Sequence, residues 1–325
     1  MVTLAQIRRA QQRIRGVAVR TPLIAYFPPA QNSNAGNGQL WLKPESLQPI
    51  GAFKIRGAYN KIMSLSDAER ERGVITYSSG NHAQGVAYAA RALGVKAVIV
   101  MPRNAPRLKV EATAALGAEI VAVGPASSER MRKAEELAAQ HGYVVVPPYN
   151  DEHIIAGQGT AGLEILEDCP DVDLVLIPVG GGGLISGVSA ALKLGGSTTK
   201  IVGVEPALAN DAQQSFRKGE IVELPAERVS STLADGLRTQ SVGPINFEHI
   251  RSFVDDMITV GEDEIRAAMR ELALNARQVA EPSGAVTFAA WRFHREQLPE
   301  ARKAVAVISG GNVDPQLLSE VLASD

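Results

Sequence analysis

The stretch Gly51-Ala52-Phe53-Lys54-Ile55-Arg56-Gly57 places a lysine between two apolar residues, with a glycine three positions before it and three after it. Apolar surroundings keep water from an amine and lower the pKa of a lysine, which favours the neutral amine that attacks a carbonyl. Many lysines are instead solvated cations at the start of a helix, and the stretch alone leaves both interpretations open. Lys54 is therefore a candidate Schiff-base lysine.

The segment that follows this stretch alternates strand and helix patterns. We expect strands at residues 74–77, 97–101, 119–123 and 144–146, and helices at residues 83–93, 107–116 and 129–141. Gly94, Gly117 and Gly142 each stand where a helix gives way to a strand, which is typical of the first residue after a helix. The alternation predicts a small parallel sheet with right-handed crossovers.

The chain on either side of this segment predicts a second unit of the same class. Further buried strands are expected at residues 40–43, 174–178, 201–205, 257–260 and 304–308, whereas residues 221–256 read as irregular. A chain of 325 residues is longer than one core usually serves. We therefore expect an α/β fold of two open lobes, with a small domain (residues 71–149) inserted in a large one (residues 1–70 and 150–325).

Three polar motifs follow predicted strands directly. They are Ser78–Asn81, Gly180–Gly183 and Ser309–Asn312. Ligands of open α/β sheets bind beyond the carboxyl ends of the strands. The motifs therefore predict a ligand site in the cleft between the two lobes.

Two of these motifs offer backbone amides to anions. Gly180–Gly183 stands between a strand and a helix, where glycines and the helix dipole suit a phosphate, although a tight turn without ligand is the alternative. The motif has neither P-loop nor dinucleotide-binding spacing. Ser78–Gln84 forms a strand-to-helix turn that suits a carboxylate, and the alternative is an ordinary helix cap made by Ser79 or Asn81.

The composition excludes several classes of partner. Net charge is −2, with 45% apolar and 21% charged residues, which gives no general attraction to nucleic acid. No apolar run reaches the length of a membrane span, and Cys169 is the single cysteine. Residues 1–44 contain arginines and no acid, as organelle transit peptides do. The helical spacing of Leu4 and Ile14 favours a folded helix instead, so we expect a cytoplasmic protein.

Six motifs in the chain resemble one enzyme family. They are Lys43–Gln48, Gly51–Ala58, Ser78–Gly85, Ala156–Thr160, Gly180–Leu184 and Ser309–Asn312. Together they resemble the serine/threonine dehydratase and serine racemase family of fold type II pyridoxal phosphate enzymes. The one small departure is Ala52, where many members have serine.

The resemblance implies a tryptophan synthase β-like fold with pyridoxal 5′-phosphate in the cleft. It also implies β-elimination from a 3-hydroxy amino acid, with L-threonine and L-serine as first candidates, giving a 2-oxo acid and ammonia through aminoacrylate. Alternatives are an amino-acid racemase, a dehydratase of another substrate such as 3-hydroxyaspartate, a β-replacement enzyme and a non-catalytic binding protein. Members of the family are expected to form homodimers.

The family's cofactor contacts map onto this sequence residue by residue. Lys54 would form the Schiff base and move the Cα proton, and Phe53 would pack beside the cofactor ring. Asn81 would bond the phenolic oxygen, and Ser309 would meet the pyridine nitrogen. The phosphate would be held by Gly180, Gly181, Gly182 and Gly183. A neutral hydroxyl at the ring nitrogen leaves a weaker electron sink, which suits β-elimination.

The resemblance also assigns a substrate site to the loop after the first strand of the small domain. Ser78, Ser79, Asn81 and His82 would surround the substrate carboxylate. Ser79 further resembles the serine that racemising members use as an acid and base on the opposite face of the substrate. A racemase side activity is therefore expected from this residue.

A divalent cation site is implied by Val204–Asp211, which resembles the one in serine racemases. Glu205 and Asp211 would give carboxylates and Ala209 its carbonyl, all hard oxygen ligands for Mg²⁺ or Ca²⁺. The alternative is two solvated acids near a helix start.

Overall fold

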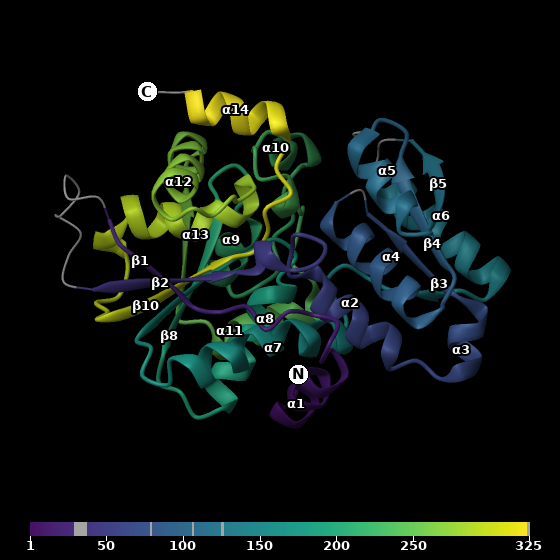
Figure 1. The fold of residues 1–325 in the computed structure, drawn as a ribbon, viewed down its shortest axis with the longest axis horizontal. Coiled ribbons are helices and arrows are strands. Elements are labelled where there is room, and N and C mark those ends of the chain that lie inside the picture. Colours follow the sequence, from purple (N-terminus) through teal and green to yellow (C-terminus); the bar gives the residue numbers. More distant parts are fainter. Residues whose placement is uncertain (29–37, 79, 106, 125–126, 324–325) are drawn as a thin grey trace.

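The computed structural model describes residues 1–28, 38–78, 80–105, 107–124 and 127–323, and over these ranges its strands form two sheets (Figure 1). The larger sheet has the order β1-β2-β10-β7-β8-β9. Its strands are β1 (Ile24–Tyr26), β2 (Gln39–Pro44), β7 (Leu174–Pro178), β8 (Lys200–Pro206), β9 (Asp256–Val260) and β10 (Lys303–Ile308). All neighbours are parallel except β1, which pairs antiparallel to β2.

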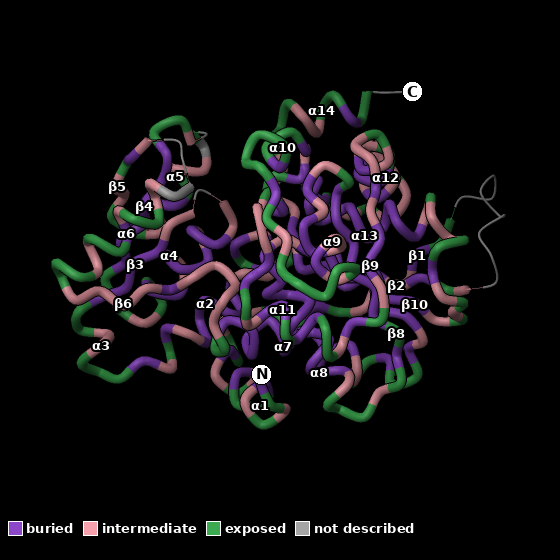
Figure 2. Tube along the Cα trace, turned by 180° about the vertical axis from the view of Figure 1, so that it is seen from behind, coloured by how far each residue is buried: buried purple, intermediate pink, exposed green. Residues whose placement is uncertain are grey.

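Successive side chains of the larger sheet enter two different cores. Leu174 and Leu176 of β7 pack with the helices α12 and α13, whereas Val175 and Ile177 pack with α7 and α8. This follows from the two-residue period of a strand, and burial on both faces explains why the strand is apolar throughout. The buried chain fills the interior of this lobe in Figure 2.

The helices around the larger sheet come from both ends of the chain. They are α1 (Leu4–Arg13), α2 (Lys54–Met63), α7 (Glu152–Asp168), α8 (Gly183–Leu194), α9 (Asp211–Lys218), α10 (Ala226–Ser230), α11 (Pro244–Phe253), α12 (Glu262–Asn275), α13 (Pro282–Phe293) and α14 (Pro315–Ala323), with short 3₁₀ turns η2 (Glu45–Leu47), η3 (Asp235–Leu237) and η4 (Arg295–Gln297). Helix α2 packs on α7 and also on α4 of the other lobe. It therefore stands at the boundary between the two lobes.

The smaller sheet is wholly parallel, in the order β5-β4-β3-β6. Its elements are β3 (Val74–Tyr77), β4 (Ala97–Pro102), β5 (Glu119–Val123), β6 (Val144–Val145), α3 (Asp67–Arg72), α4 (Asn81–Leu93), α5 (Arg107–Ala115) and α6 (Ser127–His141). Gly94, Gly117 and Gly142 have φ between +66° and +88°, as expected after a helix. The predicted two-lobed α/β fold is confirmed, and the domain bounds at residues 70 and 150 stay a prediction.

One prediction about local structure is wrong. Residues 221–256 were expected to be irregular, but Pro244–Phe253 forms helix α11 and buries Phe247 and Ile250. A proline at the first helical position is favourable. The apolar periodicity of this segment is weak, so most of the stability of the helix comes from the burial of its side chains in the tertiary structure. Within the described ranges, no helix combines the length and the apolar character needed to cross a bilayer.

Candidate active site

The predicted lysine stretch is fastened to the C-terminal motif by backbone hydrogen bonds. The Phe53 amide donates to the Ser309 carbonyl at 3.0 Å, and the Gly311 amide donates to the Gly51 carbonyl at 2.9 Å. Gly51 has φ +71°, and a Cβ there would lie 2.3 Å from Oδ1 of Asn312. Both the conformation and the close approach require glycine. Two motifs more than 250 residues apart in the sequence therefore meet at the start of α2.

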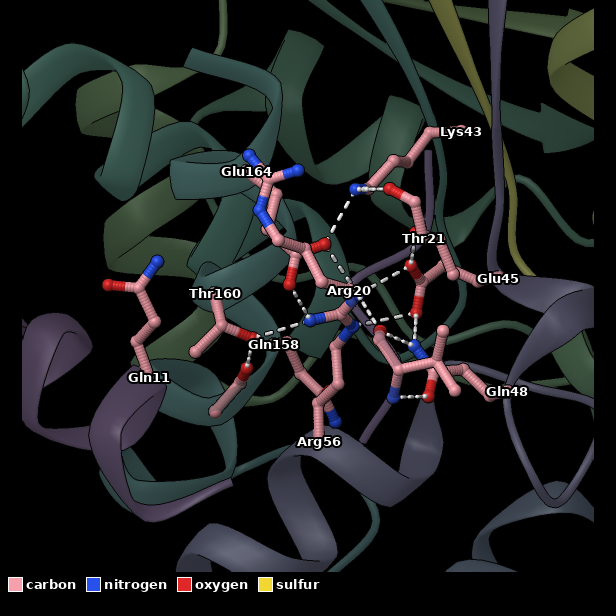
Figure 3. Close-up of polar contacts among 12 residues, drawn as sticks. Gln11, Arg20, Thr21, Lys43, Glu45, Gln48, Arg56, Gln158, Thr160 and Glu164 are labelled. Carbon is pink, nitrogen blue, oxygen red and sulfur yellow. Dashed lines mark hydrogen bonds and ion pairs between the residues drawn. The ribbon is translucent and has the colours of Figure 1, made fainter. Parts of the chain in front are cut away.

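Helix α2, which follows this loop, is held by a buried network of ion pairs (Figure 3). We call Lys43, Glu45, Arg56 and Glu164 the four-ion network. Arg56 donates to Glu45 Oε2 at 2.7 Å and to Glu164 Oε1 at 2.6 Å, and Lys43 donates to Glu164 Oε2 at 2.6 Å. Two positive and two negative charges balance, and Arg56 lies two residues after Lys54. The network therefore fixes where α2 begins.

Lys54 extends from the first position of α2 toward the other lobe. Its Nζ donates to the Pro148 carbonyl at 2.8 Å and lies 5.0 Å from the centre of the Phe53 ring. Burial lowers the pKa of Lys54 to about 8. A substantial fraction of this amine is therefore neutral near physiological pH, as a nucleophilic lysine requires.

The four-glycine turn lies next to the same segment. It connects β7 to the start of α8, whose first amides have no acceptor within the helix. A Cβ on Gly181 would lie 2.2 Å from the ring of Tyr149, and one on Gly182 would lie 2.8 Å from Cβ of Asn246. Side chains at these positions would displace the turn. Glycine is thus required at these positions, and the turn brings its backbone amides to a helix N-terminus, which is where a phosphate binds.

A chain of contacts connects the glycine turn back to Ser309. The Gly236 amide donates to Ser283 Oγ at 2.9 Å, and a Cβ on Gly180 would lie 3.3 Å from the Gly236 carbonyl. Ser309 Oγ lies 3.4 Å from the Ser283 carbonyl and is buried, so this hydroxyl makes only a long hydrogen bond. The hydroxyl therefore stays available to another partner on the same side of the cleft.

The turn between β3 and α4 leads into the N-terminus of α4 at Gly80. The cap residue is Gly80, and no side chain among the described residues caps the helix. Ser78 Oγ accepts from the Gly80 amide at 3.3 Å. Ser79 lies outside the described residues. The alternative of an ordinary cap made by Asn81 is wrong, because its side chain bonds Glu281 and Asn312. Among the described residues, no side chain takes the amides of Asn81 and His82, which suit a carboxylate.

His82 is buried, with Nε2 3.0 Å from the Val146 carbonyl. Burial, reinforced by the nearby Lys54 cation, lowers the pKa of His82 to about 3. The ring is therefore neutral at physiological pH and too weak a base to take a Cα proton.

Glu281 is a residue of this site that sequence reasoning missed. Asn81 Nδ2 donates to Glu281 Oε1 at 2.7 Å, and Asn312 Nδ2 donates to Asn81 Oδ1 at 2.8 Å. Burial, with a smaller contribution from Asp235, raises the pKa of Glu281 to about 7. An available signal was Glu281 directly before Pro282, which marks a helix start bearing an acid.

The predicted cation ligands lie where β8 passes into α9. Glu205 accepts from the amides of Ala212 and Gln213 at 3.1 and 2.7 Å. Neither carboxylate oxygen of the buried Asp211 has a hydrogen bond of acceptable geometry. Burial and then the Asp211 charge raise the pKa of Glu205 well above its ordinary value, and burial raises that of Asp211 to about 7.

Ala209 is buried in the turn between these two acids. Across the described part of the chain, no group of three or more His, Cys, Asp or Glu side chains is arranged for a metal. The predicted site therefore has two carboxylates and a backbone carbonyl, and Mg²⁺ would complete its coordination with water.

The residues at the cleft fit pyridoxal phosphate. They offer a desolvated amine at Lys54, a glycine-rich helix N-terminus for a phosphate, a buried hydroxyl at Ser309 for the ring nitrogen and the Asn81 amide for the phenolic oxygen. These are the groups that this cofactor requires of a protein.

Comparison with known proteins agrees with this fit. The model of the family "Pyridoxal-phosphate dependent enzyme" matches residues 14–310. L-threonine ammonia-lyase of Thermotoga maritima is 45% identical over 324 residues, which cover 99% of this chain and 78% of that protein. L-threo-3-hydroxyaspartate ammonia-lyase of Saccharomyces cerevisiae is 42% identical over 312 residues, which cover 96% of this chain and 94% of that protein.

Among solved structures, maize serine racemase superposes with a TM-score of 0.92 at 38% identity, covering 98% of this chain and 96% of that one. These findings confirm the resemblance, the fold type and the cofactor expected from the sequence. The chain belongs to the family of pyridoxal-phosphate dependent enzymes.

Proposed function

We propose that this enzyme is an ammonia-lyase that dehydrates and deaminates a 3-hydroxy amino acid, with L-threonine and L-serine as its substrates. The observation that carries the proposal is Lys54, a desolvated amine with a pKa lowered to about 8. It stands at the lobe boundary, near the start of α4, which no described side chain caps. The similarity to the two ammonia-lyases supports the reaction type.

Bound pyridoxal phosphate supplies an electron sink conjugated to the substrate nitrogen, which stabilises the electron pair left when Cα loses its proton. The amides of Asn81 and His82 bind the substrate carboxylate at the N-terminus of α4. Lys54 Nζ accepts the Cα proton, the Cβ–O bond breaks, and the β-hydroxyl leaves as water after taking up one proton, which balances the proton removed from Cα. Hydrolysis of the released product then gives a 2-oxo acid and ammonia.

The direct test is a paired assay on purified holoenzyme. L-threonine, L-serine and 3-hydroxyaspartate are each supplied, and 2-oxo acid and D-amino acid are measured together. We expect oxo acid from threonine and serine with little D-isomer. Oxo acid from 3-hydroxyaspartate alone would overturn the substrate assignment, and no oxo acid from any of the three would overturn the reaction.

Racemisation is the second candidate, favoured by the Ser79 motif and by the likeness to maize serine racemase. A dominant D-isomer in the paired assay would make it the main activity. Ser79→Ala should then abolish D-isomer formation. Under the dehydratase proposal the same variant retains most of its oxo acid production, since Lys54 acts on the other face of the substrate.

We also infer that Glu205, Ala209 and Asp211 bind Mg²⁺ or Ca²⁺. The support is the buried carboxylate of Asp211, which has no hydrogen bond of acceptable geometry among the described residues, beside a second buried carboxylate. Two like charges in a protein interior are unfavourable unless a cation or protons neutralise them. The homodimer and the cytoplasmic location stay predictions, and light scattering of the purified protein tests the former.

A further inference from the structure

Glu281 is a buried acid at the cofactor site, and no cation among the described residues forms an ion pair with it. It is 3% exposed and occupies the cap position of α13. The charged groups that act on it from neighbouring elements are Asp235 of η3, which disfavours its ionised form, and Lys109 of α5, which favours it. Lys109 is itself paired with Asp235, so the two offset each other. Burying a carboxylate without an ion pair is unfavourable, so we expect Glu281 to have a role in the site.

The hydrogen bonds around Glu281 have a fixed direction. The Ile50 carbonyl can only accept, and it receives Asn312 Nδ2 at 2.8 Å. The second proton of Asn312 Nδ2 goes to Asn81 Oδ1 at 2.8 Å. This leaves the Nδ2 end of Asn81 to face Glu281, whose ionised carboxylate also only accepts. Asn81 therefore retains one Nδ2 proton that no group in this chain of hydrogen bonds takes.

The backbone is shaped to admit the carboxylate. A Cβ on Gly310 would lie 2.4 Å from Glu281 Oε1, and a Cβ on Gly284 would lie 2.4 Å from the Gly310 carbonyl. The Glu281 amide donates to the same Gly310 carbonyl at 3.1 Å. Two glycines thus allow Glu281 to reach Asn81, and larger residues there would push it away.

We propose that Glu281 is a positioning residue that holds the Asn81 carboxamide so that its remaining Nδ2 proton is presented to the phenolic oxygen of the cofactor. This deepens the proposed function and rests on the role it gives to Asn81. Protonation of Glu281 adds a donor and removes the negative charge, which weakens its hold on Asn81. The optical state of the bound cofactor therefore depends on the charge of Glu281.

The test compares two substitutions of the same residue. Glu281→Gln keeps an acceptor oxygen of the same shape without a charge, and Glu281→Leu removes the acceptor. We expect Glu281→Leu to weaken cofactor binding about tenfold or more, as for loss of a hydrogen bond to a charged group. Glu281→Gln should bind the cofactor within about threefold of wild type but lose the absorbance change of wild type at about pH 7.

A double-mutant cycle with Asn81→Ala separates positioning from general damage. If Glu281 acts through Asn81, the double variant Glu281→Leu/Asn81→Ala binds the cofactor no more weakly than Asn81→Ala alone. If the double variant instead loses cofactor affinity by the product of the two single losses, the proposal is overturned. The matched control is Glu271→Gln. Glu271 is a partly buried acid on α12 that bonds Tyr26 and Arg292, and its substitution should leave the cofactor spectrum unchanged.

If Glu281→Leu does not fold, the pH dependence of cofactor absorbance in Glu281→Gln is sufficient to test the proposal. An absorbance change at about pH 7 that is the same in this variant as in wild type would overturn it. Cofactor affinity and absorbance need no substrate. A wild-type enzyme that binds cofactor but yields no oxo acid would therefore refute the proposed function while leaving this inference testable.

Discussion

The four-ion network and the Glu205–Asp211 pair are both buried, but their charges are balanced in opposite ways. In the network, Arg56 and Lys43 face Glu45 and Glu164, all at 5% side-chain exposure or less. Burial raises the pKa of Glu45, yet the charge and hydrogen bonds of Arg56 outweigh it and hold that pKa below its ordinary value. In the pair, two acids face each other and both pKa values rise.

The contrast separates a structural cluster from a ligand site. The positive and negative charges of the network balance each other, so it needs no ion from solution. It can therefore fix the first turn of α2, where Lys54 lies. In the pair, two buried carboxylates act on each other and no described cation balances them, so they need protons or a cation from solution. Burial of charge alone therefore does not identify a binding site, whereas unbalanced buried charge does.

The largest expected effect comes from breaking the balanced cluster. Arg56→Met leaves Glu45 and Glu164 buried with one cation between them, which should lower the free energy of unfolding by about 3–5 kcal/mol. Urea denaturation followed by circular dichroism measures this. A loss below about 1 kcal/mol would show that the network does not hold α2.

The second prediction sharpens the other side of the comparison. Mg²⁺ at a hundred times its dissociation constant should stabilise the protein by about 2.7 kcal/mol, seen as a rise in melting temperature. Asp211→Asn should remove most of this response. A full response in that variant would place the cation elsewhere.

The pair also sets a pH dependence in cation-free protein. Both folded pKa values are raised, so between about pH 4 and pH 7 the folded state binds more protons than the unfolded state. Stability should therefore fall as the pH rises through this window, and Glu205→Gln should flatten the fall. Melting temperatures in a chelator from pH 4 to pH 8 test the sign.

The smallest effect is expected at an exposed ion pair. Arg20 bonds Glu167 and Asp168, with 52% of its side chain exposed. Solvent screens such a pair, so Arg20→Gln should cost less than about 1 kcal/mol in the same urea assay. A cost equal to that of Arg56→Met would mean that burial does not distinguish the two ion-pair clusters.

The sequence predicted the elements whose signal is local. Glycines after helices and the alternation of strands and helices over residues 74–146 depend on neighbours along the chain, and the structure has them. Helix α11 and the role of Glu281 depend on tertiary contacts. Phe247 is apolar in any fold, but only packing against the large lobe makes its segment helical.

The candidate site shows the same division. Motif order indicated Lys54, Asn81 and Ser309, because a family resemblance preserves residue types. No spacing rule predicts that the Pro148 carbonyl accepts a hydrogen bond from Lys54, or that the buried Glu281 accepts one from Asn81. These partners come from segments about 90 and 200 residues away, so only the folded chain brings them together.

The central claim is that Lys54 holds the cofactor, and borohydride reduction of the holoenzyme tests it most directly. Reduction fixes the cofactor to the amine that carries it, and peptide mass spectrometry then locates the modified lysine. We expect the phosphopyridoxyl group on Lys54, with no stable label in Lys54→Ala. A label on another lysine, such as Lys109 at the opposite lobe, would contradict it.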